Sequence, residues 1–166
     1  MKTSDFYYDL PPELIAQTPA KERSASRLLV YDRGTRTISD EVFTDIVRHL
    51  RPGDVLVRNT TRVIPARIFG HRPETGGTME FLLLKRLDAH HWECLVRPGR
   101  RAKPGLTYTI SDELSATICE PTDAGGRVIR LDYDGVFEEI LDRVGEMPLP
   151  PYITERLAER ERYQTV

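Results

Sequence analysis

The feature that most constrains this chain is a series of short apolar stretches with strand character between residues 63 and 133. Gly-Gly or Pro-Gly steps separate several of these stretches, at 76–77, 98–99, 104–105 and 125–126. Short strands joined by such turns, with no helical pattern between them, are typical of antiparallel barrels and sandwiches. We therefore expect strands at residues 63–69, 78–87, 92–97, 106–110, 114–119 and 127–133.

Helical patterns stand on both sides of this series. Residues 42–50 and 136–144 each place apolar side chains on one helical face, and a short helix is expected at 9–15. Apolar runs at 28–31 and 55–57 predict buried strands. The sequence thus predicts a mixed α/β unit with an inserted antiparallel β unit, which is a small barrel or a sandwich. The α/β unit would begin at residues 1–60, the inserted β unit would occupy 61–134, and residues 135–166 would return to the α/β unit.

The charge of the chain limits how it can bind a polyanion. Its formal net charge is −2, so any contact with RNA would depend on a local basic patch. The amino terminus lacks a secretory signal and no apolar run reaches membrane-spanning length, which predicts a cytoplasmic protein with no membrane partner. Cys94, Cys119 and the histidines lack ligand spacing, so we expect buried free thiols and no metal.

One basic run offers such a patch. Arg97, Arg100, Arg101 and Lys103 lie in a short segment stiffened by proline and interrupted by glycine. These side chains could grip the phosphates of a nucleic acid, which would make binding sensitive to salt. They could equally be the solvated charges of a hairpin loop. The residues alone leave the two interpretations near even.

Polar residues at the end of the apolar run 55–57 form a second candidate site. Asn59, Thr61 and Arg62 would face a ligand crevice if that run is a strand, because crevices open at strand ends. Arg62 could bind a carboxylate or a phosphate, or make an ion pair, and an ion pair is favoured for Arg67. Tyr152, in a proline-stiffened segment, could stack on a base or only pack between units.

The ordered motifs of the chain resemble one enzyme family. The segments Pro52-Gly-Asp-Val-Leu-Val-Arg-Asn-Thr-Thr-Arg-Val-Ile-Pro-Ala-Arg67 and Gly145-Glu-Met-Pro-Leu-Pro-Pro-Tyr-Ile153 carry most of the likeness. Further matching stretches lie at 4–11, 15–17, 26–30, 82–84, 92–99, 103–105 and 161–166. The chain is similar to the S-adenosylmethionine:tRNA ribosyltransferase-isomerases of queuosine biosynthesis. It resembles the N-terminal half of such an enzyme, and its apolar close at Tyr163, Thr165 and Val166 predicts an element that continues further.

This resemblance implies a reaction. The ribosyl part of S-adenosylmethionine would be transferred to the aminomethyl group of a deazaguanine base in the tRNA anticodon and isomerised to give epoxyqueuosine. The implied partners are that tRNA and S-adenosylmethionine, which is a consumed substrate, so no cofactor is expected. We expect a monomer, and no residue of this chain is identified as the general base. This half alone is expected to be inactive.

The resemblance favours RNA phosphates as the ligand of Arg97, Arg100, Arg101 and Lys103. It assigns substrate binding to Asn59, Thr61, Arg62 and Tyr152, with S-adenosylmethionine or tRNA as the molecule held. It implies the same layout of a small β-barrel inserted into an α/β domain. A different class of function stays open, namely a non-catalytic RNA-binding β-barrel module.

Overall fold

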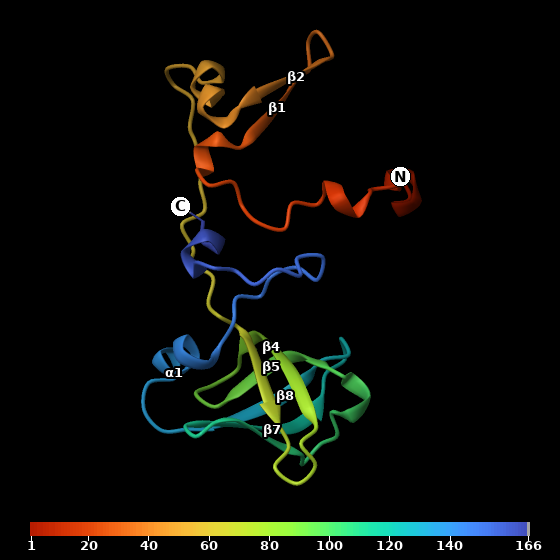
Figure 1. Cartoon of the computed structure of the whole chain (residues 1–166), viewed down its shortest axis with the longest axis vertical. Coiled ribbons are helices and arrows are strands. Elements are labelled where there is room, and N and C mark those ends of the chain that lie inside the picture. Colours follow the sequence, from red (N-terminus) through yellow and green to blue (C-terminus); the bar gives the residue numbers. More distant parts are fainter. Residues whose placement is uncertain (166) are drawn as a thin grey trace. The chain divides into compact units, whose positions relative to one another are not determined.

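The computed structural model describes residues 1–165, and by compactness the chain divides into two units. One unit consists of residues 1–60 and 151–162, and the other of residues 61–150 and 163–165. Figure 1 follows the chain through both units by colour.

The first unit is built on one hairpin. Strand β1 (Arg27–Asp32) pairs antiparallel with β2 (Thr37–Val42), and the Asp32 carboxylate accepts the Thr35 amide at 2.7 Å within the turn. That hydrogen bond is the main reason that the pKa of Asp32 is lowered. The 3₁₀ helices are Thr3–Phe6, Pro12–Leu14, Arg23–Ala25 and Phe43–His49, with Arg160–Tyr163 near the end of the chain.

The α-helices and the strand expected in the first sixty residues differ from this. The expected helices at 9–15 and 42–50 are 3₁₀ turns, and residues 55–57 form no strand. The physical reason is missing burial: no side chain among residues 1–60 or 151–162 is fully buried. Phe43 is 46% exposed and Val57 is 88% exposed. An amphipathic helix depends on packing for most of its stability, so without a covered face the chain keeps shorter turns.

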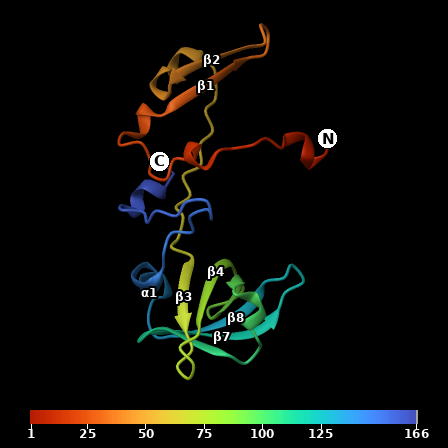
Figure 2. The same ribbon diagram turned by 45° about the vertical axis from the view of Figure 1, so that its right-hand side comes forward.

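The second unit is a closed barrel of antiparallel strands in the order β3-β4-β5-β8-β7-β6 (Figures 1 and 2). The strands are β3 (Arg67–His71), β4 (Thr78–Arg86), β5 (His91–Arg97), β6 (Thr107–Ser111), β7 (Leu114–Pro121) and β8 (Arg127–Tyr133). The antiparallel barrel predicted from the sequence is confirmed. The protein as described is therefore mostly β structure.

Strand β3 is the one that departs from its expected position. It was expected at 63–69 but begins at Arg67. Pro65 has no amide hydrogen for a ladder. The amide of Ala66 bonds locally to the Ile64 carbonyl at 2.7 Å, so the chain turns before the strand begins.

The barrel encloses the apolar core, and one helix completes it. Helix α1 (Phe137–Val144) lies beside the barrel in both ribbon views (Figures 1 and 2). Its buried residues Phe137, Ile140 and Leu141 join the same core cluster as the inward side chains of the strands. The rings of Trp92 and Phe137 lie 5.6 Å apart between centroids. No helix within residues 1–165 is long and apolar enough to cross a membrane.

Gly145 lets the chain leave α1 close to the barrel. A Cβ atom at this position would lie 2.1 Å from the Pro65 carbonyl oxygen and 2.7 Å from that of Leu141. The next residue, Glu146, forms an antiparallel bridge with Arg67 at the start of β3. Glycine is thus required here because backbone approaches backbone, and backbone cannot give way as a flexible side chain can.

We predict that Gly145→Ala destabilises the protein by about 1–3 kcal/mol, the usual cost of forcing extra volume into a packed site. The control is Gly99→Ala, because an added Cβ at Gly99 meets nothing within 4 Å. Urea unfolding followed by tryptophan fluorescence measures both variants. Equal stability of the two variants would contradict the close approach at Gly145.

Candidate functional site

The basic run lies at one end of the barrel, and the strand order explains what it meets there. Strands β3 and β5 both pair antiparallel with β4, so their carboxyl ends lie at the same end of the barrel. The turn after β3 begins at Arg72, and its amide bonds to the Gly77 carbonyl at 2.9 Å. The connection after β5 carries Arg100 and Arg101 in the 3₁₀ turn Gly99–Arg101, followed by Lys103.

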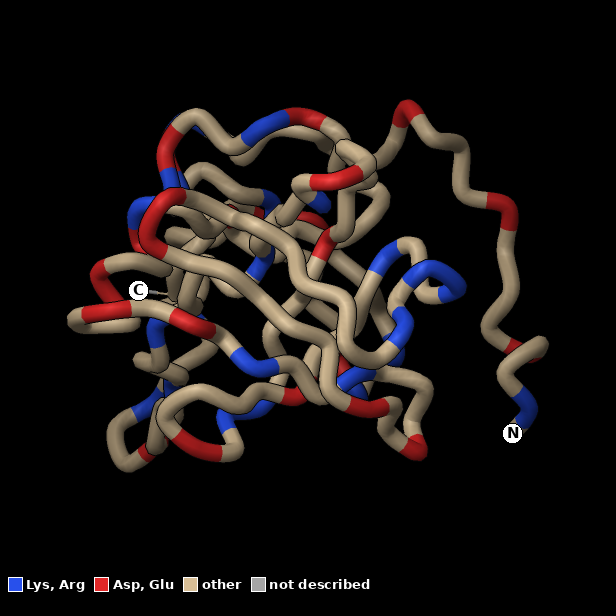
Figure 3. Tube along the Cα trace, turned by 90° about the horizontal axis from the view of Figure 1, so that it is seen from below, with Lys and Arg blue, Asp and Glu red and all other residues tan. Residues whose placement is uncertain are grey.

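These two connections border a hollow of about 670 Å³. The residues that line it include Arg72, Thr75, Arg100, Arg101, Lys103 and Tyr108. No carboxylate is among the lining residues, whereas acidic and basic residues are interspersed along the chain trace as a whole (Figure 3). We name this hollow the cationic hollow. Its composition is suited to an anion.

Three of the four residues predicted to bind RNA share this hollow, and Arg97 does not. Arg97 is paired with Glu80 across β4 and β5 and lines a separate hollow of about 210 Å³ with it. The nearby carboxylate makes that place less suited to a phosphate. Sequence reasoning missed Arg72, which is far from Arg100 and Lys103 in the chain. The pairing of β3 and β5 with β4 brings it to the same hollow. The one signal for it was a basic residue at the start of a glycine-containing turn.

The segment with the second candidate site is extended and exposed. Asn59, Thr61 and Arg62 lie in residues 54–66, which form no helix or strand. They were expected at the end of a buried strand, and this expectation is wrong for the described chain, since Val55 and Val57 are 87% and 88% exposed. Without a sheet to cover it, an apolar run cannot stay buried.

A buried glutamine anchors the backbone beside Arg62. Gln164 is 5% exposed, accepts the Val63 amide at 2.7 Å and donates to the Val63 carbonyl at 2.8 Å. The hydroxyl of Thr165 donates to the Thr61 carbonyl at 2.8 Å. The backbone on both sides of Arg62 is therefore held by hydrogen bonds. No pattern in the sequence indicated this role for Gln164.

Arg67 has a structural role, as expected. Its Nε lies 2.9 Å from the Glu80 carboxylate, and its guanidinium donates to the Leu149 carbonyl at 3.0 Å. Both partners are partly shielded from solvent, with side chains 24% and 26% exposed. The ion pair favoured from the sequence is present, and it ties β3 to β4.

Tyr152 is presented by a segment that Gln17 holds in place. The Gln17 amide donates to the Tyr152 carbonyl at 3.0 Å, and its oxygen accepts the Thr154 amide at 2.8 Å. The Tyr152 residue itself is 57% exposed. Segments 17–21 and 153–162 border a hollow of about 290 Å³. The exposed ring beside an anchored backbone is available for stacking.

Known proteins are similar to this chain along nearly its whole length. A profile of the family described as "Queuosine biosynthesis protein" matches residues 3–166. The chain belongs to that family. Among its relatives, proteins named S-adenosylmethionine:tRNA ribosyltransferase-isomerase from Clostridioides difficile (strain 630) and Symbiobacterium thermophilum are 56% and 58% identical to it. Each match covers 100% of this chain and 49% of the relative, so the queuosine family chain spans about half the length of the curated relatives it matches.

A solved structure is also similar. The crystal structure of S-adenosylmethionine tRNA ribosyltransferase from Thermotoga maritima is 40% identical in sequence. That match covers 85% of this chain and 48% of the Thermotoga maritima chain, with a TM-score of 0.42. The family profile and the curated relatives confirm the family resemblance expected from the motifs.

The two cysteines of the chain differ in burial and therefore in reactivity. Both are free, but Cys94 is buried while Cys119 is exposed, although both were expected inside. Burial raises the pKa of the Cys94 thiol to about 12, with a smaller opposing effect from the positive charge of Arg127. Only the thiolate is nucleophilic, so Cys94 is inert at neutral pH.

We therefore predict that iodoacetamide at about pH 8 labels Cys119 of the folded protein and leaves Cys94 unlabelled. Mass spectrometry of peptides counts the modified thiols before and after denaturation. In the Cys119→Ser variant the native protein should take up no label. Rapid labelling of Cys94 in that variant would contradict the closed barrel core.

Proposed function

We propose that this chain serves an enzyme that transfers and isomerises the ribosyl moiety of S-adenosylmethionine onto an aminomethyl-deazaguanine base in the tRNA anticodon, giving epoxyqueuosine. The observation that carries this proposal is the 54–58% identity, along the whole chain, to relatives named for this activity. S-adenosylmethionine would be consumed as a substrate. The donor brings its own sulfonium leaving group, so orientation and charge stabilisation suffice as contributions from the protein. The enzyme would act as a cytoplasmic monomer.

The α/β unit is part of this proposal. Residues 1–60 and 135–166 would belong to it, with the barrel at 61–134, and further residues such as the relatives possess would complete its layers. The support is the exposure of Leu56 and its two valine neighbours at 69–88%. Such an apolar run is suited to a strand buried on both faces of an α/β sheet.

RNA binding is assigned to the barrel. Arg100, Arg101 and Lys103 would contact tRNA phosphates, with Arg97 close by on the same strand and loop. The support is their convergence on a hollow whose lining has no carboxylate. Phosphate contacts give affinity and register, and the base chemistry would take place elsewhere.

Substrate binding is assigned to Asn59, Thr61, Arg62 and Tyr152. The support is that hydrogen bonds from Gln164 and Thr165 hold the backbone around Arg62, while Gln17 holds the backbone of Tyr152. Anchored backbone lowers the entropy lost when a side chain orders around a ligand. Arg62 would hold a carboxylate or a phosphate, and Tyr152 would stack on a base.

We predict that residues 1–166 alone release no adenine above background from S-adenosylmethionine in the presence of substrate tRNA. The physical reason is the lack of a buried core in residues 1–60, which leaves a substrate site there without fixed walls. The Clostridioides difficile relative, assayed beside it by chromatography of adenine, is the positive control. Sustained turnover by this chain would contradict the need for further residues. An enzyme of the relatives' length that binds tRNA without turnover would favour the RNA-binding module.

A second prediction concerns Arg62 in an enzyme of the relatives' length that carries this sequence. Arg62→Ala should lower kcat/KM about tenfold or more, because a hydrogen bond to a charged group contributes about 1.5–3 kcal/mol. Its melting temperature should stay close to that of the parent enzyme, since the side chain is exposed. Steady-state kinetics and thermal unfolding are measured on the same sample.

Two variants sharpen this test. Arg62→Lys keeps the charge but loses the planar fork, so activity retained in it would argue for simple electrostatics. Arg33→Ala removes an exposed arginine from the β1–β2 turn and should leave kcat/KM unchanged. A lowered melting temperature with normal activity per folded Arg62→Ala molecule would show a structural role instead.

A further inference from the structure

We infer that the cationic hollow is a built phosphate-binding site for the RNA backbone, completed by Arg72 and held in shape by Arg127. This inference rests on the proposed function for the identity of the ligand, RNA, but the site itself is argued from the barrel. Two elements go beyond the basic run of residues 97–103. One is Arg72, a cation from the β3–β4 hairpin. The other is Arg127, which holds the backbone of the basic loop by hydrogen bonds.

Arg72 supplies a cation that is partly withdrawn from water. Its side chain is 31% exposed, and its Nε atom is shielded from solvent with no hydrogen-bond acceptor within residues 1–165. Its guanidinium lies 3.5 Å from the carboxylate of Glu74, whose side chain is 69% exposed. A partly desolvated guanidinium attracts an anion more strongly than a solvated one, because the local dielectric constant is lower. The shielded Nε of Arg72 is therefore suited to donate a hydrogen bond to an anion.

Arg127 fixes the backbone of the loop opposite Arg72. Its guanidinium donates to the carbonyls of Ala102 at 2.9 Å, Gly126 at 2.7 Å and Gly99 at 3.3 Å. The carbonyls of Gly99 and Ala102 lie at either end of the segment that carries Arg100 and Arg101. Arg127 stands at this end of the barrel because β8 runs antiparallel to β5 and pairs it with Cys94. It acts as a positioning residue, since each of its three nitrogens donates a hydrogen bond to a backbone carbonyl.

The lining of the hollow fits a sugar-phosphate backbone. Leu106 is a partly exposed apolar residue of the lining against which a ribose can pack, and Thr75 and Thr78 add hydroxyl groups. The cations come from two different connections of the barrel, which offers several points of contact to a strand with successive phosphates. A lone carboxylate or a single small anion would use only part of this arrangement. Arginine forks match phosphate oxygens in particular.

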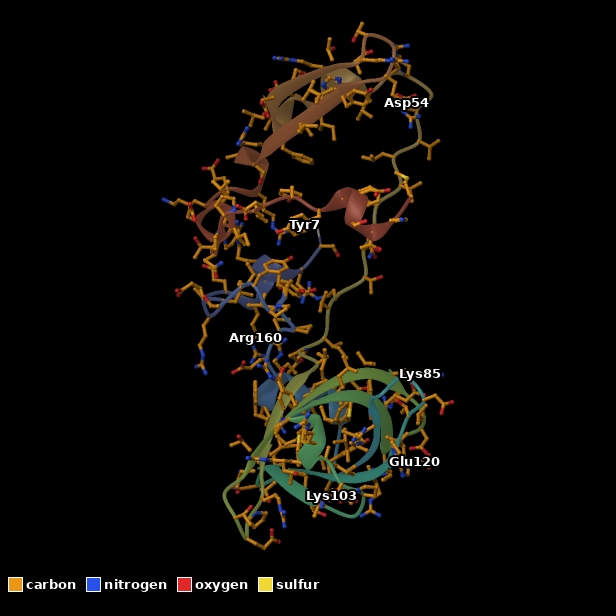
Figure 4. The ribbon with its side chains drawn as sticks, turned by 90° about the vertical axis from the view of Figure 1, so that its right-hand side faces the viewer. Tyr7, Asp54, Lys85, Lys103, Glu120 and Arg160 are labelled. Atoms are coloured by element: carbon orange, nitrogen blue, oxygen red, sulfur yellow. The ribbon has the colours of Figure 1, made fainter. Side chains whose placement is uncertain are left out.

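The test uses residues 1–166 and a fluorescently labelled RNA hairpin with a single-stranded loop, with binding followed by anisotropy over a range of salt concentrations. Arg72→Ala and Lys103→Ala should each weaken binding several-fold. Each should also make the slope of log Kd against log salt shallower by about 0.7–0.9, the value for one lost phosphate contact. The matched control is Lys85→Ala, an exposed lysine near the far end of β4, which lies on a different part of the barrel from Lys103 (Figure 4). It should leave the slope unchanged.

Arg127→Lys tests the positioning role. Lysine keeps the net charge but cannot reach three carbonyls at once, so RNA binding should weaken several-fold although no charge is lost. Thermal unfolding followed by tryptophan fluorescence checks that the barrel is folded at the assay temperature. Unchanged affinity of the folded Arg127→Lys protein would overturn the positioning role.

Competition at constant ionic strength identifies the ligand chemistry. Inorganic pyrophosphate should displace the RNA hairpin, and S-adenosylmethionine, which has no phosphate, should not. Displacement by S-adenosylmethionine, or equal slopes for Arg72→Ala and Lys85→Ala, would overturn the inference. This assay involves no turnover, so it tests the phosphate site separately from the reaction. If an enzyme of the relatives' length binds RNA through Arg72 but is inactive, that result contradicts the proposed reaction and supports the phosphate site.

Discussion

Closure of the barrel through the pairing of β3 with β6 is the constraint on which the rest of the second unit depends. The pairing joins His71 to Thr109 and brings the first and the fourth strands of the barrel together. Gly70 makes it possible, because a Cβ there would lie 2.8 Å from the Cβ of Tyr108. Inside the closed wall, Phe81 and Tyr108 meet edge to face at 5.6 Å between ring centroids. Each large apolar side chain buried in this way contributes about 1.5–3 kcal/mol.

The same closure organises charge. The chain has a net charge of −2, yet the topology collects several cations at one end of the barrel. The carboxyl ends of β3 and β5 and the amino end of β8 lie together, so Arg72, the Gly99–Arg101 turn and Arg127 become neighbours. Two arginines then do different work. Arg127 has its donors on backbone carbonyls, whereas Arg72 turns a partly shielded guanidinium toward the hollow.

The first unit shows the opposite condition. Its hairpin β1–β2 is held by backbone hydrogen bonds and by the Arg27–Asp40 ion pair at 3.1 Å, both partners of which are exposed. Surface ion pairs contribute little, and a two-stranded hairpin is marginal without a covered face. The many exposed apolar side chains of residues 1–60 therefore indicate a surface made for burial.

The sequence by itself determined the antiparallel strands of the second unit, because short alternating stretches with Gly and Pro turns have few other ways to bury their apolar faces. Closure into a barrel and not a sandwich was decided by the pairing of β3 with β6. Pattern, however, describes only local preference. It placed residues 55–57 in a strand that does not form, and its helix at 42–50 is a 3₁₀ helix at Phe43–His49, because no surface covers either segment. It grouped Arg97 with Arg100 because they are close in sequence, whereas the ladder directs Arg97 toward Glu80. Only the tertiary structure decided that Arg72 and Arg127 belong with the basic loop and that Gln164 holds Val63. These contacts join residues far apart in the chain, and their geometry exists only after the barrel has closed.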